Sequence, residues 1–242
     1  MPPISTAFHE ASVPRRAWCI APALLLLIAC GPRSAPSPAP RIVGANSAWP
    51  LAGREKVATG TSAMIVAGNV IASNVGRAVL QQGGNAVDAA VAVGFAMAVV
   101  DPEAGNIGGG GFMLIRLADG ERQLLDYRER APGAATRDMF LGPDGKATDK
   151  SQIGHLASGI PGAVAGMLEA HRRYGSLPLA RLLDPAIALA RDGFPLDSIR
   201  SARIRGDSAK LARFPASAKI FLPGGRVPAR GERLIQSDLA RT

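Results

Sequence analysis

The chain has 242 residues, of which 47% are hydrophobic, so it can bury the core of one large domain or of part of one. Its net charge of +9 is uneven, because residues 60–195 carry 12 basic and 13 acidic side chains whereas residues 196–242 carry 10 and 4. The basic segment lacks the interleaved aromatic residues of a nucleic-acid-binding surface. We therefore predict a solvated, arginine-rich face and no nucleic-acid partner.

Residues 1–29 have the pattern of a bacterial export signal. Arg15 and Arg16 precede an apolar run of 13 residues, 17–29, which is too short to span a membrane as a helix, since about 20 are needed. The run ends in Leu-Ile-Ala-Cys, which resembles a lipoprotein signal in which Cys30 becomes the acylated first residue. The alternatives are an ordinary signal with a chance cysteine and a twin-arginine signal, whose pattern is less complete.

Residues 30–59 predict a tether between this signal and a folded domain. Proline and serine are dense over residues 31–40, and such a segment is semi-rigid and does not pack. We expect the protein to be exported to the periplasm or the cell surface and anchored to a bacterial membrane through lipid on Cys30. A single acyl chain binds a membrane only marginally, so more than one acyl group is expected.

The cysteines limit the chemistry of the domain that follows, residues 60–242. Cys19 lies in the signal and Cys30 would carry lipid, which leaves no thiol in the folded part. Disulfides, cysteine–zinc sites and cysteine nucleophiles are therefore excluded there. His155 and His171 are the only histidines after the signal, and we predict neither a metal site nor a cofactor.

The first part of this domain is predicted to be mainly helical. Residues 63–67 predict a short buried strand, and Ser73 predicts the N-cap of a helix that reaches about Gln82. Asn85 predicts a second N-cap, which Asp88 completes three residues later. The second helix has no polar side chain over residues 89–100, so it must be covered on every side and we place it between layers.

Two further helices are predicted in the second half of the chain. Residues 161–174 are amphipathic and predict a helix that stops at Gly175. Residues 179–191 predict another helix, which Pro185 should kink or split. Residues 193–242 predict an arginine-rich helix and Pro/Gly loops.

Four consecutive glycines, residues 108–111, precede a predicted β-hairpin with strands at 112–117 and 123–127. Glycines allow a positive φ and a close approach of another chain or a ligand. A phosphate-binding loop is disfavoured, because no Lys-Ser/Thr pair and no helix follow directly. Two interpretations stay open: a structural role, in which the apolar helix packs against the next strand, and access of a substrate to a pocket.

Arg128 follows the second predicted strand. An arginine in this position is either a surface ion-pair partner or a bidentate ligand for a carboxylate, for which a planar guanidinium is well suited. The G-x-S-x-G, H-E-x-x-H and S-x-x-K hydrolase motifs do not occur. His155 and His171 are predicted to be plain surface residues. The residues alone therefore show no pair of nucleophile and base.

Five motifs in consistent order resemble the N-terminal half of the γ-glutamyltranspeptidase family: QGGNAVDAAVA, GxxGGGGFML, DYRERAP, GIPGAVAGMLEAHRRYG and LLDPAIALARDGFPL. The resemblance covers about residues 64–242. It implies an α/β (α+β) fold, the αββα sandwich of N-terminal-nucleophile hydrolases, here incomplete. Precursors in that family cut themselves into a large and a small subunit. The new N-terminal threonine of the small subunit is the nucleophile and its α-amine is the base.

The resemblance implies a substrate-binding role for one residue of this chain. In the family the arginine of the R-E-x-A-P motif binds the glutamyl α-carboxylate, and Arg128 holds that position. Residues 104–106, just before the glycines, depart from the serine or other small residue that is common in the family. The threonine motif of the small subunit does not occur here, and Thr242 cannot serve because it is C-terminal. We therefore expect no catalytic residue in this chain, which would be a truncated large-subunit part.

The function implied by the resemblance is that of a γ-glutamyltransferase or glutathione hydrolase that forms a threonine acyl-enzyme. The small catalytic subunit would be the missing partner, and the chain alone should be inactive. The alternatives are a related acylase that acts on the glutaryl side chains of β-lactams, and a non-catalytic lipoprotein that binds γ-glutamyl compounds. A half sandwich should expose its inner sheet edge and the helix at residues 89–100, so the isolated chain is expected to aggregate.

Overall fold

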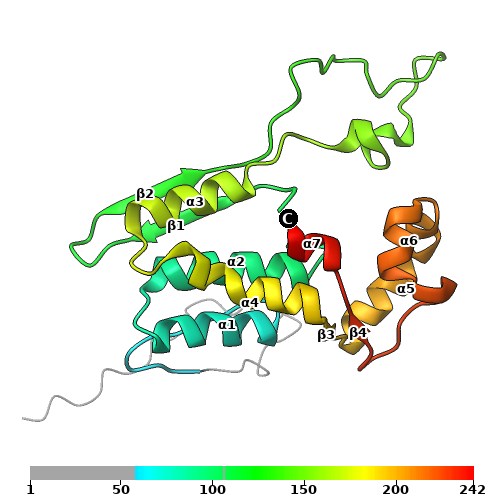
Figure 1. Cartoon of the computed structure of the whole chain (residues 1–242). Helices are drawn as coiled ribbons and strands as arrows, with labels where there is room; N and C mark the ends of the chain where they lie inside the picture. Colours follow the sequence, from blue (N-terminus) through cyan, green and yellow to red (C-terminus); the bar gives the residue numbers. More distant parts are fainter. Residues whose placement is uncertain (1–57, 106) are drawn as a thin grey trace, which may run out of the picture. The chain divides into compact units, whose positions relative to one another are not determined.

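The computed structural model describes residues 58–105 and 107–242, which belong to one compact unit that begins at Ala58 (Figure 1). The signal at residues 1–29, the lipidation candidate Cys30 and nearly all of the tether lie outside the described residues. The elements in chain order are α1 (Val70–Gln81), α2 (Ala86–Val100), β1 (Phe112–Arg116), β2 (Arg122–Asp126), the 3-10 turns η1 (Asp149–Ser151) and η2 (His155–Ala157), α3 (Ala163–Tyr174), α4 (Leu179–Asp192), β3 (Phe194–Pro195), α5 (Ser198–Ala212), α6 (Pro215–Phe221), the 3-10 turn η3 (Pro223–Gly225), β4 (Arg233–Leu234) and α7 (Ser237–Arg241).

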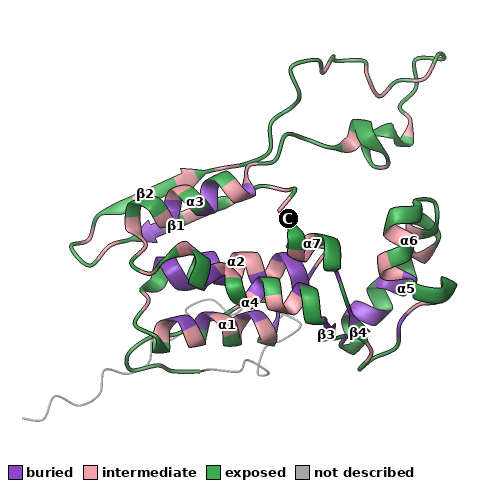
Figure 2. Ribbon diagram, viewed as in Figure 1, coloured by how far each residue is buried: buried purple, intermediate pink, exposed green. Residues whose placement is uncertain are grey.

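The apolar helix α2 lies at the centre of this unit. Helices α1, α3 and α4 all pack against it, and Val91, Ala92 and Ala96 are completely buried. Figure 2 shows buried segments along α2. The prediction that α2 is covered by neighbours is confirmed. The expectation that it would be exposed in a half sandwich is wrong, because these three helices of the same unit cover it.

The N-termini of α1 and α2 are capped by asparagine side chains. The predicted capping box of α2 is present: Asn85 Oδ1 accepts from the Asp88 N–H at 2.9 Å, and Asp88 Oδ2 accepts from the Asn85 N–H at 2.9 Å. Helix α1 begins earlier than predicted, because Asn69 rather than Ser73 is its N-cap and accepts from the Ile71 N–H at 2.8 Å. Asn69 is buried and also donates to the carbonyl of Val100 at 3.3 Å, so contact with α2 selects this cap.

Asp88 also joins α2 to the connection between α3 and α4. This carboxylate is completely buried. It accepts from the backbone N–H of Ser176 at 3.0 Å, from the Ser176 hydroxyl at 2.5 Å and from the Leu177 N–H at 3.4 Å. Burial raises the pKa of Asp88, but the hydrogen bonds from Ser176, Asn85 and Leu177 outweigh it and leave the pKa below its ordinary value.

Strands β1 and β2 form the predicted hairpin, paired antiparallel with Leu114 opposite Leu124. One face packs on the core through Ile115, which is buried. The other face exposes Phe112, Leu114 and Leu124, which are 57%, 74% and 63% accessible. This sheet has two strands among the described residues, and the expected open inner edge of a half sandwich stays a prediction. An apolar sheet face is open.

The predicted strand at residues 63–67 is not formed. Met64 and Val66 are 51% and 86% accessible, whereas Ile65 and Ala67 are half-buried against the helices. The alternation is that of an extended segment, but no strand pairs with it within the described part. A strand needs such a partner for its backbone groups.

Helix α4 runs through Pro185 as one helix, so the predicted split is wrong. Its buried side chains are Leu182, Ala186 and Ala190, which lie at helical spacing on one face. The arginine-rich residues after Gly193 form α5, α6, a two-residue β3–β4 pair and α7. Among the described residues no helix is both long enough and apolar enough to cross a bilayer.

Candidate functional site

Arg128 lies two residues beyond β2, on the open side of the hairpin. Its backbone N–H donates to Asp126 Oδ1 at 3.1 Å, which fixes the turn out of the strand. Its guanidinium carbon is 5.9 Å from the centre of the Phe112 ring, in cation–π geometry. Arg128 is exposed, and within the described residues it forms no ion pair with a carboxylate. The surface ion-pair interpretation therefore finds no support here.

The glycine run passes directly beside the Arg128 backbone. A methyl group on Gly110 would lie 2.8 Å from Arg128 Cα and 2.6 Å from the Tyr127 carbonyl oxygen. Gly111 and Tyr127 exchange backbone hydrogen bonds of 3.4 and 3.0 Å. None of the four glycines has a positive φ in the described structure, so close approach is the reason for glycine here.

The run also meets the start of α3. The carbonyl of Gly109 accepts from the backbone N–H groups of Gly162 and Ala163, both at 2.9 Å. The structural role predicted for the glycines is thus present, but with different partners. They pack against the exit of β2 and the first turn of α3 rather than joining α2 to the next strand.

A cavity of about 470 Å³ lies beside Arg128, between the end of the hairpin and α3. Its charged lining residues are Asp126, Arg128, Arg130, Glu169 and Arg173. Hydrogen bonds from Arg172 and Arg173 lower the pKa of Glu169 to about 2, so this carboxylate is ionised and already neutralised. Arg128 and Arg130 are the cations of this lining without such a partner in the described chain, and the cavity therefore suits an anion.

Both histidines were predicted to be plain surface residues, and this is correct for one of them. His155 is exposed at the start of η2, as predicted. His171 is half-buried, and its Nε2 lies 2.7 Å from the carbonyl oxygen of Leu177, so it is not a plain surface residue. Neither histidine lines the cavity at Arg128.

A second charged cluster surrounds Arg200 of α5, which sequence reasoning placed on a solvated face. Arg200 is nearly buried and donates to Asp101 at 2.9 Å and to Asp197 at 2.9 Å. Its neighbour Arg203 pairs with Glu103 at 3.0 Å. Asp197, three residues before Arg200, was a visible signal in the sequence, whereas Asp101 is 99 residues away and was not.

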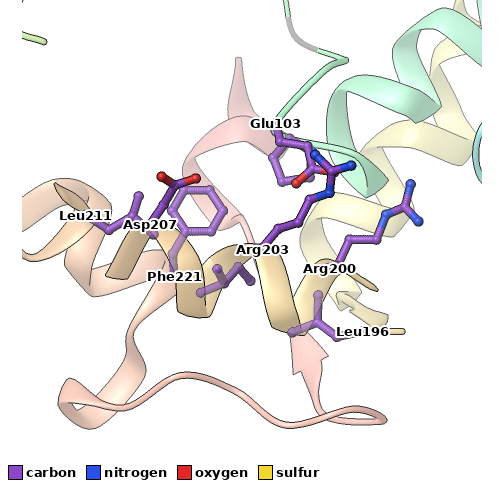
Figure 3. A pocket seen from close by; sticks show the side chains of 9 residues that line it. Glu103, Leu196, Arg200, Arg203, Asp207, Leu211 and Phe221 are labelled. Carbon is purple, nitrogen blue, oxygen red and sulfur yellow. The ribbon is translucent and has the colours of Figure 1, made fainter. Parts of the chain in front are cut away.

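Glu103, Arg200 and Arg203 of this cluster border a cavity of about 150 Å³, whose other lining residues are apolar except for Asp207 (Figure 3). Figure 3 shows the Arg203 side chain reaching toward Glu103 and the ring of Phe221 beside Leu211. Burial raises the pKa of Glu103, and Arg203 opposes this effect. Because its arginines are paired with carboxylates, this cavity offers less to an anionic substrate than the one at Arg128.

Comparison with known proteins defines the family. The model of the family described as Gamma-glutamyltranspeptidase matches residues 72–242. The glutathione hydrolase proenzymes of Pseudomonas sp. (strain A14) and Escherichia coli (strain K12) are 50% and 45% identical to this chain over 181 residues, which are 74% of this chain and 32% and 31% of theirs. The acylase ACY 1 proenzyme of Pseudomonas sp. (strain V22) is 42% identical over 86% of this chain and 37% of its own.

Solved structures agree with this assignment. The γ-glutamyltranspeptidase of Helicobacter pylori matches with a TM-score of 0.74 and 41% identity, over 77% of this chain and 54% of that one. The enzyme from Pseudomonas nitroreducens, solved in complex with L-DON, matches with a TM-score of 0.69 and 40% identity, over 76% and 53%. The chain belongs to the γ-glutamyltranspeptidase family, as the motifs predicted. It spans about a third of the length of the curated relatives that it matches.

Proposed function

We propose that this chain is the N-terminal part of a proenzyme that hydrolyses glutathione or transfers its γ-glutamyl group. The observation that carries the proposal is that Arg128 lines an open cavity at the end of the hairpin, beside the glycine run, and has no carboxylate partner in the described chain. The relatives named glutathione hydrolase support the substrate class. The role of Arg128 itself stays a prediction from the R-E-x-A-P motif.

In this proposal Arg128 binds the α-carboxylate of the γ-glutamyl group through two parallel N–H···O bonds. A threonine from polypeptide outside this chain attacks the γ-amide carbonyl, and its own α-amine accepts the hydroxyl proton. The proton then passes to the leaving amine as the C–N bond breaks. In the second half-reaction water or an acceptor amine attacks the glutamyl ester. The glutamyl group is transferred to it and the threonine regains its hydroxyl proton. The residues described here bind and orient the substrate.

The open sheet face provides a contact for the missing part. Phe112, Leu114 and Leu124 form an apolar face on the hairpin, and a second sheet packed on it would complete the αββα sandwich. We place the small catalytic subunit there. This arrangement would also cover the Arg128 guanidinium, which lies over Phe112 on the same face, and exclude water from the bound carboxylate.

The cellular location is part of the proposal. A lipid on Cys30 and a tether at residues 30–59 would hold the domain, residues 60–242, on the outside of a bacterial membrane. Labelling with a radioactive fatty acid, followed by mass spectrometry of the N-terminal peptide, tests this. Cys30→Ser should abolish both the label and membrane association, and a Cys30→Ser protein that stays membrane-bound would contradict the anchor.

A second candidate function is that of an acylase for glutaryl groups. The acylase ACY 1 proenzyme aligns with a larger share of this chain than the two glutathione hydrolases do. The two substrates share the carboxylate that Arg128 would bind and differ in the α-amine, which a glutaryl group lacks. Turnover of γ-glutamyl and glutaryl anilides, compared side by side, separates the two. A non-catalytic binding protein would turn over neither.

The test of the main proposal is Arg128→Ala in the proenzyme that carries this chain. We expect KM for a γ-glutamyl anilide to rise by about 10- to 100-fold, because the loss of a charge-assisted hydrogen-bond pair costs about 1.5–3 kcal/mol. Self-cleavage should stay nearly unchanged. If Arg128→Ala impairs substrate binding and self-cleavage equally, Arg128 has a folding role instead. Turnover by residues 1–242 alone would contradict the proposal that the nucleophile lies outside this chain.

A further inference from the structure

Tyr127, the residue before Arg128, sits against three glycines. A methyl group on Gly166 of α3 would lie 2.1 Å from Tyr127 Cγ, and one on Gly111 would lie 3.1 Å from its Cε2. A methyl group on Gly162 would lie 2.2 Å from the Tyr127 carbonyl oxygen. Real Cβ atoms do not come this close, so glycine is required at positions 162 and 166. We call these three residues, Gly111, Gly162 and Gly166, the glycine socket.

The Tyr127 ring is held in the socket on more than one side. Its hydroxyl donates to the carbonyl of Phe112 at 3.4 Å, a long hydrogen bond. Burial raises the pKa of the phenol, so the ring enters the socket in its neutral form. The ring is therefore fixed mainly by packing, and its hydroxyl contributes little.

The placement of Tyr127 decides where Arg128 points. The backbone hydrogen bonds between Tyr127 and Gly111 extend the strand pairing to Tyr127, and successive side chains of a paired strand lie on opposite sides. Tyr127 faces α3, so Arg128 faces the open side of the hairpin, where its guanidinium lies over the Phe112 ring. The Arg128 backbone is confined as well, because Gly110 passes within contact distance of its Cα. A ring that leaves the socket would release the chain at residues 127–128 and move the guanidinium.

We infer that Tyr127 is a positioning residue for Arg128: its ring, locked in the glycine socket, sets the direction of the guanidinium that binds substrate. The inference rests on the proposed function, since it presumes that Arg128 binds the substrate carboxylate. It assigns to Tyr127 a part in substrate affinity and no part in the bond-breaking steps.

The test uses Tyr127→Leu and Tyr127→Phe in the proenzyme that carries this chain. Tyr127→Leu should raise KM for a γ-glutamyl anilide about tenfold and change kcat less than about twofold, because a displaced binding group weakens ground-state and transition-state binding alike. Tyr127→Phe keeps the ring and should stay within about twofold of the wild type. The matched control is Ile115→Ala, which is buried on the core face of the same hairpin and does not line the cavity at Arg128; it should lower Tm without raising KM.

A second variant tests the socket itself. Gly166→Ala should also raise KM, since its methyl group would overlap Tyr127 at Cγ and Cδ1. An increase in KM for Ile115→Ala as large as that for Tyr127→Leu would overturn the inference, because loss of packing in the hairpin would then suffice. So would a Tyr127→Leu protein with wild-type KM. If Arg128→Ala leaves KM unchanged, the proposed function itself has failed.

Discussion

Arg128 and Asp88 show how differently two charged residues can serve the same fold. Arg128 is exposed, borders a cavity and has no carboxylate partner in the described chain. Asp88 is completely buried, and every hydrogen bond it accepts is structural. A buried charge with several donors stabilises the fold, whereas a partly solvated cation beside a cavity is free to bind a ligand.

Asp88 makes the stability of the unit depend on pH. Its pKa in the folded state lies below the ordinary value of 3.8, so its contribution is fully present above that value and is lost as the pH falls toward the folded pKa. Asp88→Asn should lower the free energy of unfolding at pH 7 by about 2 kcal/mol, because buried donors lose their charged acceptor. Urea unfolding at pH 7 and pH 3 measures this, with Asp138→Asn as an exposed control.

The difference between the wild type and Asp88→Asn should shrink at pH 3, below the ordinary pKa of 3.8, because Asp88 then binds a proton more readily in the unfolded state than in the folded state. A difference that stays constant between the two pH values would mean that the charge of Asp88 is not what the hydrogen bonds stabilise.

At the scale of elements, glycine has opposite roles in the hairpin region and in α5. At Gly110 an added methyl group would lie within 2.8 Å of three backbone atoms, which cannot move aside cheaply. At Gly206, in the middle of α5, nothing lies within 4 Å of such a methyl group. The two positions therefore form a matched pair for the same substitution.

Gly110→Ala should lower the free energy of unfolding by about 1–3 kcal/mol through overpacking. Gly206→Ala should raise it by about 0.5–1 kcal/mol, since alanine is the better helix former. Chemical denaturation of both variants gives the two values. Stabilisation by Gly110→Ala would show that the glycine run is not in contact with the Arg128 backbone.

How far the sequence could predict these elements depended on the range of the deciding contact. The cap formed by Asn85 and Asp88 is local, and its three-residue spacing predicted it correctly. Asn69, and not Ser73, is the N-cap of α1 because Asn69 also donates a hydrogen bond to the carbonyl of Val100, 31 residues away. The strand at residues 63–67 was predicted from a short apolar run, but a strand also needs a neighbouring strand.

Likewise, only part of the candidate site could be predicted from the sequence. Arg128 was found through a motif, whereas the role of its surroundings depends on how α3 meets the hairpin. Gly162 and Gly166 stand one helical turn apart in the sequence, which signals a close contact on one helix face, but Tyr127 as the residue in contact could not be deduced. The burial of Arg200 against Asp101 could not be deduced from the sequence either.

At the scale of the whole molecule, the described unit is a mixture of helices and two small sheets with one apolar sheet face open. Residues 58–242 alone should therefore self-associate. The double variant Leu114→Lys/Leu124→Lys should lower the apparent mass in sedimentation experiments and leave the helical circular dichroism signal unchanged. Leu156→Lys, an exposed leucine outside the hairpin, is the control. A wild-type unit that is monomeric at high micromolar concentration would contradict this prediction.

The same two lysines should block maturation of the proenzyme, because they would place charge between the two proposed sheets. Normal self-cleavage in the double variant would show that the second sheet does not pack on this face.

The most direct test of the carboxylate-binding role of Arg128 changes the substrate and the protein together. KM and kcat are measured for γ-glutamyl anilide and for 4-aminobutyryl anilide, which lacks only the α-carboxylate, with wild-type and Arg128→Ala proenzyme. We expect the wild type to prefer the γ-glutamyl compound in kcat/KM by about 10- to 100-fold and Arg128→Ala to lose most of that preference. An equal preference in both proteins would contradict the assignment of Arg128 to the substrate carboxylate.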